Sequence, residues 1–325
     1  MKAIHVESEF APLRKVVLTQ SELIFPGEDD NTGDYDFLPE EILHLYDGID
    51  IAGKNYKDVF PERQQQWEQE RENLKSVLEK YGVQVLRPRL LTDYEKQRDK
   101  ERGCANFFAR DPFFTVGSSV IEGSLRFYHR RNEILPIRDI LMRETLDGDA
   151  YYVAVPQPDI SQGIGSEAGP FLEGGDVLVL GKTVLVGNSG LASNHNGYLW
   201  LKSYLAHWDY RVIEVPLKPE VLHLDCALSL VRDGLMIVCE EALLHGIPQP
   251  LKDWDRIPVP YQDLAHLAIN GLPINEQVYI TDPQFGYIIE ELQKRHIHVE
   301  TVDFRISRSL GGSFRCSTQP LARSY

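Results

Sequence analysis

The sequence lacks four features, each of which would assign it to a particular class of protein. Its 325 residues contain no run approaching the roughly eighteen apolar residues that a membrane-spanning helix needs. Segment 1–20 carries acidic residues early and has no apolar core of a secretory leader, so a cytoplasmic protein is expected. There are only 34 Lys and Arg residues against 49 Asp and Glu residues, a net charge of −15. This deficit argues against nucleic acid as the main partner, because neutralising phosphates needs clustered basic side chains.

The fourth scarce feature is cysteine. No two of the cysteines form a CxxC pair, so the sequence indicates neither a zinc knuckle nor a thioredoxin-like site. In a cytoplasmic chain such residues are free thiols, of which at most one is usually reactive. The cysteines are Cys104, Cys226, Cys239 and Cys316.

Linkers and low-complexity tracts are also missing, so residues 1–325 are expected to form a single domain. The two most loop-like stretches, 26–41 and 156–171, are rich in Pro, Gly, Asp and Ser. We interpret both as flaps over a site rather than as domain boundaries.

A recurring pattern predicts the fold class. A helical face over 61–81 runs directly into an alternating strand at 83–88, and the same helix-then-strand order returns at 198–216 and 285–304. Hairpins are predicted at 176–187 and at 227–239, with turns at Gly and Asp-Gly positions. This pattern favours a radially repeated α/β fold. A doubly wound parallel sheet is the alternative, against which the hairpins argue.

Cys316 is the candidate nucleophile, within SLGGSFRCSTQP at 309–320. Gly311 and Gly312 allow a close backbone approach or a positive φ just before it. Arg315 and the polar neighbours are expected to lower the pKa of the thiol. The alternative is a buried cysteine that acts as a small apolar side chain.

Two further motifs offer a histidine and carboxylates. His223 and Asp225, in HLD, are expected on one face of the first strand of the second hairpin, as proton shuttle and cation anchor. LEGGDV at 172–177 places Glu173 and Asp176 around two glycines. It lacks the spacing of a phosphate-binding loop. A solvent-facing pair and a turn with a capping acid remain the respective alternatives.

Charged residues also interrupt an aromatic segment at 105–117, where Arg110 and Asp111 are expected inside a buried strand. Such a pair is costly without partners, which favours a function for it. Downstream, Arg126, Arg130 and Arg131 form a basic cluster suited either to a substrate carboxylate or to structural ion pairs.

Together these motifs supply one thiol, one histidine and three carboxylates. A guanidinium ion is planar, resonance-stabilised and therefore a poor electrophile, so it needs carboxylates to hold it and compensate its charge. A thiolate can then add to its central carbon while a histidine protonates the leaving amine.

The motifs occur in the order found in a known superfamily. PLRKVV at 12–17, RDP at 110–112, EGGD at 173–176, HLD at 223–225 and GG…C at 311–316 span most of the chain. The sequence resembles the guanidino-group-modifying enzymes of the pentein fold, which include amidinotransferases, arginine deiminases and dimethylarginine hydrolases. The resemblance is strongest to the amidinotransferase branch.

The resemblance implies a five-bladed, pseudo-symmetric α/β propeller of ββαβ units with the site at its axis. It implies that Cys316 is the nucleophile and His223 the general acid and base. Glu173 would orient this histidine or contact the guanidinium, whose nitrogens Asp111 and Asp225 would bind.

Substrate contacts are implied more weakly for Arg130 and Asn106. Segment 188–205 is similar to amidinotransferases. Where we align the carboxylate-binding arginines of the deiminases and of the glycine enzyme, this chain has Leu191 and Ala242, so the sequence leaves both substrates unidentified.

The lead hypothesis is an amidinotransferase that forms a covalent amidino-cysteine and then passes the amidino group to an amine. The second is a guanidine hydrolase in which water replaces the amine, and a third is a non-catalytic binding protein of the same fold. The expected partners are a small guanidino substrate and an amine acceptor, with neither nucleic acid nor membrane, and a homodimer is one assembly considered. No metal or other cofactor is expected.

Overall fold

The structure is a computed structural model that describes residues 4–27, 38–146, 148–159, 161–163 and 165–325. Most of the first expected flap, at 26–41, lies outside the described residues, as do two positions of the second. None of the described helices combines the length and apolar character that crossing a membrane would require.

Among the described residues, five three-stranded sheets form the framework, and each combines one antiparallel pair with one parallel pair. This repetition excludes a single doubly wound parallel sheet. The sheets, each in spatial order, are β17 (Thr318–Arg323), β1 (Leu13–Leu18) and β3 (Gln84–Leu86); β5 (Phe113–Val116), β6 (Ser119–Glu122) and β7 (Tyr151–Ala154); β8 (Val177–Leu180), β9 (Thr183–Asn188) and β10 (Arg211–Pro216); β11 (Leu228–Arg232), β12 (Leu235–Val238) and β13 (Asp255–Pro258); and β14 (Leu272–Asn275), β15 (Val278–Thr281) and β16 (His298–Thr301). A two-stranded ribbon joins β2 (Glu22–Ile24) to β4 (Cys104–Asn106).

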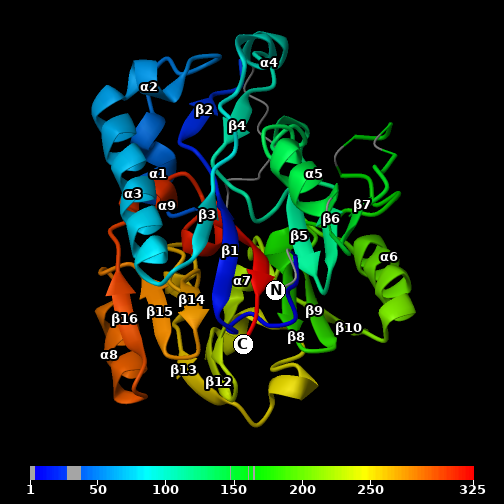
Figure 1. The fold of residues 1–325 in the computed structure, drawn as a ribbon. Helices are drawn as coiled ribbons and strands as arrows, with labels where there is room; N and C mark the ends of the chain where they lie inside the picture. The colour runs from blue at the N-terminus through cyan, green and yellow to red at the C-terminus, as the bar shows by residue number, and fades with distance from the viewer. Residues whose placement is uncertain (1–3, 28–37, 147, 160, 164) are drawn as a thin grey trace.

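Helices connect the second and third strands of four of these sheets, as expected for ββαβ units. These helices are α3 (Pro61–Lys80), α5 (Arg138–Leu146), α6 (His195–Leu205) and α8 (Gly286–Lys294), and Figure 1 shows α3, α6 and α8 toward the outside of the molecule. The shorter helices are α1 (Glu40–Leu43), α2 (Tyr56–Val59), α4 (Asp93–Arg98), α7 (Leu224–Ala227), α9 (Arg305–Arg308) and α10 (Phe314–Ser317).

The predicted helix-then-strand units are confirmed at all three positions. Helix α3 begins with Pro61, where the missing N–H costs nothing, and is followed by Gly82 with φ +74°. Its inward face buries Leu74 and Leu78 against the sheet that contains β1 and Trp67 against a separate cluster that includes Leu23 of β2. Both predicted hairpins are confirmed as well.

The two ends of the chain meet in one sheet. Strand β17 pairs antiparallel with β1, so that the blue N-terminal and red C-terminal segments lie side by side in Figure 1. The short helix α10, which carries Cys316, leads directly into β17. The pairing of β17 therefore holds the end of α10 among buried residues.

Candidate active site

Contacts from two segments hold the backbone of Cys316 in place. Its N–H donates to Oδ1 of Asn270 at 3.3 Å, and its carbonyl accepts from the N–H groups of Ala109 and Arg110 at 2.9 and 3.1 Å. The two expected properties of the glycine pair, a positive φ and a close backbone approach, are found in one glycine each. Gly311 has φ +91°, and a Cβ on Gly312 would lie 2.3 Å from the ring of Phe108.

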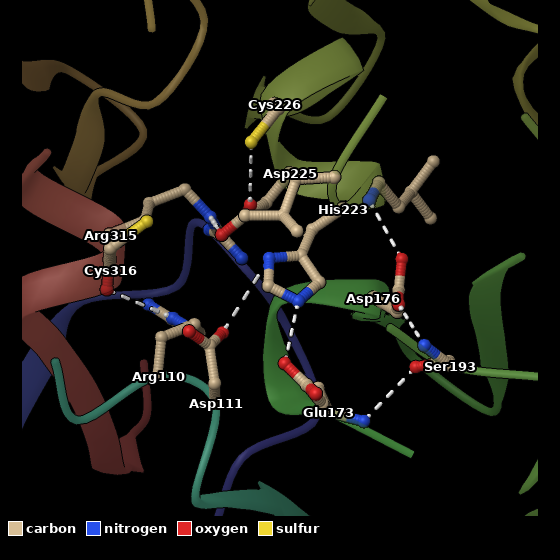
Figure 2. A network of polar contacts seen from close by, with 12 residues as sticks. Arg110, Asp111, Glu173, Asp176, Ser193, His223, Asp225, Cys226, Arg315 and Cys316 are labelled. Atoms are coloured by element: carbon tan, nitrogen blue, oxygen red, sulfur yellow. Dashed lines mark hydrogen bonds and ion pairs between the residues drawn. The ribbon is translucent and has the colours of Figure 1, made fainter. Parts of the chain in front are cut away.

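His223 is positioned by Glu173 and by a glycine. The Nε2 atom of His223 lies 3.0 Å from Oε2 of Glu173, and both side chains are fully buried. A Cβ at Gly175 would lie 2.7 Å from the imidazole ring and 2.8 Å from Oδ1 of Asp111. Gly175 therefore lets the backbone pass close to the histidine, and Gly174, whose Cβ would lie 2.0 Å from the carbonyl oxygen of Arg110, lets it pass close to the Arg110 turn. Figure 2 shows Glu173 beside the His223 ring.

The expected strand position of the HLD motif is wrong. His223 precedes the short helix α7, which contains Asp225, and strand β11 begins only at Leu228. The carboxylate of Asp176 accepts from the N–H of Leu224 at 2.9 Å and so stabilises the start of α7. The two side chains still approach one another, through a helical turn rather than through strand alternation (Figure 2).

Arg110 and Asp111 also differ from expectation, because they lie in a turn before β5 and not inside a strand. Both are buried. Oδ2 of Asp111 accepts from Arg130 at 2.8 Å, while Oδ1 lies 3.8 Å from Nδ1 of His223. Neither Oδ1 of Asp111 nor Nδ1 of His223 has a hydrogen-bond partner among the described residues. Two polar atoms are thus left unpaired at one point of the interior, where a substrate can satisfy them.

A cavity of about 40 Å³ brings several of the expected residues together. Asp111, Arg130, His223 and Cys316 line it, together with Glu133. The rest of its wall is largely apolar, with Phe107, Phe108, Phe127 and Leu310 among the lining residues. A hydrophobic wall around a few converging polar groups is typical of a small-molecule site.

Glu173 and Asp225 are not among the residues that line this cavity. Oδ2 of Asp225 accepts from Nε of Arg315 at 3.3 Å, and the Cys226 thiol donates to Oδ1 at 3.7 Å. Figure 2 shows Asp225 between the Cys316 segment and His223.

Two arginines of the basic cluster make internal ion pairs, and the third, Arg131, donates to the carbonyl oxygens of Leu125 and Arg126. Arg130 contacts Asp111, Glu133 and Glu173, while Arg126 pairs with Glu167. Of the two interpretations of the cluster, structural ion pairing describes the observed contacts.

Asn106 lies outside the cavity wall. Its amide nitrogen donates to Oε2 of Glu22 at 2.9 Å and to the carbonyl of Arg89 at 3.0 Å. These contacts tie β4 to β2 and to the segment before α4, so the expected substrate contact of Asn106 has no counterpart in the geometry.

Charges around the site set the protonation of its two central groups. Burial opposes the charge on His223, but Asp111, Glu173 and Asp176 outweigh it and raise the pKa of the imidazole to about 10. Burial, together with the carboxylates Asp225 and Asp111, raises the pKa of the Cys316 thiol well above its usual value. At neutral pH the site therefore holds an imidazolium and a neutral thiol.

The expectation that Arg315 lowers the pKa of the thiol is wrong. Arg315 is paired with Glu9 at 2.7 Å and with Asp225 at 3.3 Å, so carboxylates already compensate its charge. The groups that do lower the pKa of Cys316 are the backbone of Ser313 and the side chain of Arg110, and burial outweighs them.

Sequence reasoning missed three residues of this site. Glu133 accepts from Arg130 through both oxygens, at 3.0 Å each, and burial raises its pKa to about 7. Its place three residues after Arg130 is a pattern that could have indicated the pair. Asn270 and Glu9 approach from distant segments, and no local pattern marks them.

Asp111, Glu173 and His223 come within 4.8 Å of one another, a spacing at which side chains can bind a metal ion. Arg130 already donates to both carboxylates, and Glu173 is hydrogen-bonded to the histidine. These contacts describe an ion-paired cluster, and we do not assign it to a metal.

A family model and several curated relatives match most of this chain. The family described as "N,N dimethylarginine dimethylhydrolase, eukaryotic" matches residues 49–323. Inosamine-phosphate amidinotransferase 1 of Streptomyces glaucescens is 26% identical over 355 aligned positions, covering 100% of this chain and 98% of the relative. L-arginine:L-lysine amidinotransferase of Pseudomonas savastanoi pv. phaseolicola is 24% identical, covering 84% and 82%.

Solved structures show the same fold. An amidinotransferase from Microseira wollei in the saxitoxin biosynthetic pathway superimposes with a TM-score of 0.80 at 20% identity, covering 99% of this chain and 98% of the other. The dimethylarginine dimethylaminohydrolase of Pseudomonas aeruginosa, in complex with citrulline, gives a TM-score of 0.65 at 16% identity, covering 95% and 99%.

Proposed function

Because the chain belongs to the N,N dimethylarginine dimethylhydrolase family of the guanidino-group-modifying pentein superfamily, we propose that it is an amidinotransferase with Cys316 as its nucleophile. One observation carries the proposal: a thiol, an imidazole and a carboxylate from distant parts of the chain line one cavity. Support for transfer rather than hydrolysis comes from the amidinotransferase relatives and from the higher structural similarity to an amidinotransferase.

In the proposed reaction the guanidinium of an arginine-like donor enters the cavity at Asp111 and reaches past its present wall to Asp225, which lies between the Cys316 segment and His223 (Figure 2). Its N–H groups satisfy Oδ1 of Asp111, and its charge favours loss of the Cys316 proton to solvent. The thiolate adds to the guanidino carbon, and the imidazolium of His223 donates its proton to the departing amine. Glu173 holds the ring so that Nδ1 faces the cavity.

The second half of the reaction returns the group to a new amine. The amidino-cysteine remains in the cavity until an acceptor amine enters. Neutral His223 then accepts a proton from this amine as the C–S bond breaks, which regenerates the imidazolium and a thiolate. The thiolate recovers its proton from solvent when the new guanidinium leaves. The apolar wall limits competition from water.

A guanidine hydrolase is the second candidate, and the match to the dimethylhydrolase family favours it. In this reading water takes the place of the acceptor and the same residues act. The two candidates differ only in what reaches the covalent intermediate.

We also propose that residues 1–325 form one domain whose five sheets are the blades of a five-bladed α/β propeller. Support comes from the strand pattern that all five sheets share and from the pairing of β17 with β1.

The test is incubation with L-arginine, with and without candidate amines, followed by mass spectrometry of the acid-quenched protein. We expect an amidine adduct on Cys316, ornithine without citrulline, and turnover only with an amine. The variant Cys316→Ser should give no adduct, whereas Cys226→Ser, which alters the neighbouring buried thiol, should keep it. Citrulline or ammonia formed without an amine would support the hydrolase, and an unmodified Cys316 during turnover would exclude both.

A further inference from the structure

Glu9 is a buried carboxylate outside the cavity that no step of the proposed reaction uses. It lies in the N-terminal segment before β1 and is 4% exposed. Oε1 accepts from the N–H of Val179 in β8 at 2.9 Å, and Oε2 accepts from Nη1 of Arg315 at 2.7 Å. Glu9 therefore connects the start of the chain to the residue directly before the candidate nucleophile.

Arg315 links this carboxylate to the site. Its side chain is fully buried, and it uses Nη1 for Glu9 and Nε for Asp225. The contact to Glu9 is the shorter of the two, at 2.7 Å against 3.3 Å for Asp225. Its remaining nitrogen, Nη2, has no hydrogen-bond partner among the described residues.

Without Glu9, we expect Arg315 to change its contact with Asp225. A guanidinium presents a planar fork of donors that matches a carboxylate with two parallel hydrogen bonds. A buried arginine that loses one carboxylate is expected to pair fully with the other, because an uncompensated buried charge is costly. The carboxylate left to it here is Asp225, which would then be less available to a second guanidinium.

We propose that Glu9 is a positioning residue that holds Arg315 away from full pairing with Asp225 and so keeps Asp225 open to the guanidinium of the donor. This inference rests on the proposed function, in which Asp225 binds the donor. The other charged or titratable groups that act on Asp225 or feel its charge are Arg110, Asp111, His223, Cys226, Tyr279 and Cys316.

The experiment is a double-mutant cycle on the full chain with L-arginine as the donor. Glu9→Gln should raise the KM for arginine about tenfold, the scale of one hydrogen bond to a charged group, with kcat changed about twofold or less. Arg315→Met removes the competing cation, so adding Glu9→Gln to it should raise the KM no further. Glu7→Gln is the matched control, because Glu7 lies two residues away and pairs with Lys182 and Tyr210 instead.

The possible results distinguish this inference from the proposed function. The inference would be overturned by an unchanged KM in folded Glu9→Gln. It would also be overturned if Glu9→Gln raised the KM equally in the unmodified background and in the Arg315→Met background. In either case, arginine turnover by the unmodified chain would still uphold the proposed function. No turnover or binding of arginine by the unmodified chain would overturn both. If Glu9→Gln does not fold, Glu9→Asp keeps the charge at shorter reach. It should raise the KM about twofold to fivefold, within the range of a weakened charged contact, and an unchanged KM would contradict the inference.

Discussion

At the scale of single residues, the site needs a glycine at position 175, beside the histidine. Gly175 has no Cβ where one would meet both His223 and Asp111. We expect Gly175→Ala to displace the imidazole and to lower kcat/KM about 100-fold, as misplacements near 1 Å do. Steady-state kinetics with a thermal melt measures this. Gly286→Ala is the control, because its added Cβ meets open space, and equal losses in both variants would contradict the prediction.

The protonation of His223 gives a second prediction at this scale. Its pKa is about 10 in the folded chain against 6.5 for an unperturbed histidine. The stability from its ion pairs is therefore complete below the lower value and is lost as pH rises through the higher one. We expect the Tm of the unmodified chain to fall between about pH 7 and pH 10 more steeply than that of His223→Gln, which lacks this titration. Parallel curves for the two proteins would show that His223 is not charged in the folded state.

At the scale of elements, one helix positions the segment that carries the nucleophile. Glu70 on α3 accepts from the N–H groups of Ile306 and Ser307 at 2.7 and 3.0 Å, and so caps α9, which leads to Cys316. We expect Glu70→Ala to lower the free energy of unfolding by about 1–3 kcal/mol, because it leaves buried donors unpaired. Urea titration measures this. Glu72→Ala, which removes only an exposed pair with Arg87, should cost at most about 1 kcal/mol.

At the scale of the whole molecule, the sheet shared by both chain ends makes the fold depend on its last strand. Every residue of β17 is buried, and its backbone pairs with β1. Removing residues 318–325 should therefore leave a chain without a cooperative thermal transition, because β1 loses its partner and the core is exposed. Circular dichroism measures this. Removing only Tyr325, which is 77% exposed, should leave the transition in place.

The sequence by itself determined the parts of this protein that local patterns encode. Helix α3 and the hairpins follow from periodicity and turn residues, and the five ordered motifs indicated the superfamily. It also indicated Asp111, His223 and Cys316, because a charged pair within an aromatic segment, an HLD motif and a thiol shortly after two glycines are recognisable local signals.

Only the tertiary structure decided how those groups are held and charged. The helical turn at His223 depends on Asp176, and the ion pairs of Arg315 depend on Glu9, which lies 306 positions away in the chain. The raised pKa of Cys316 arises from burial and from carboxylates of other elements. These properties are sums of contacts between segments that only folding brings together, so no local pattern in the sequence can specify them.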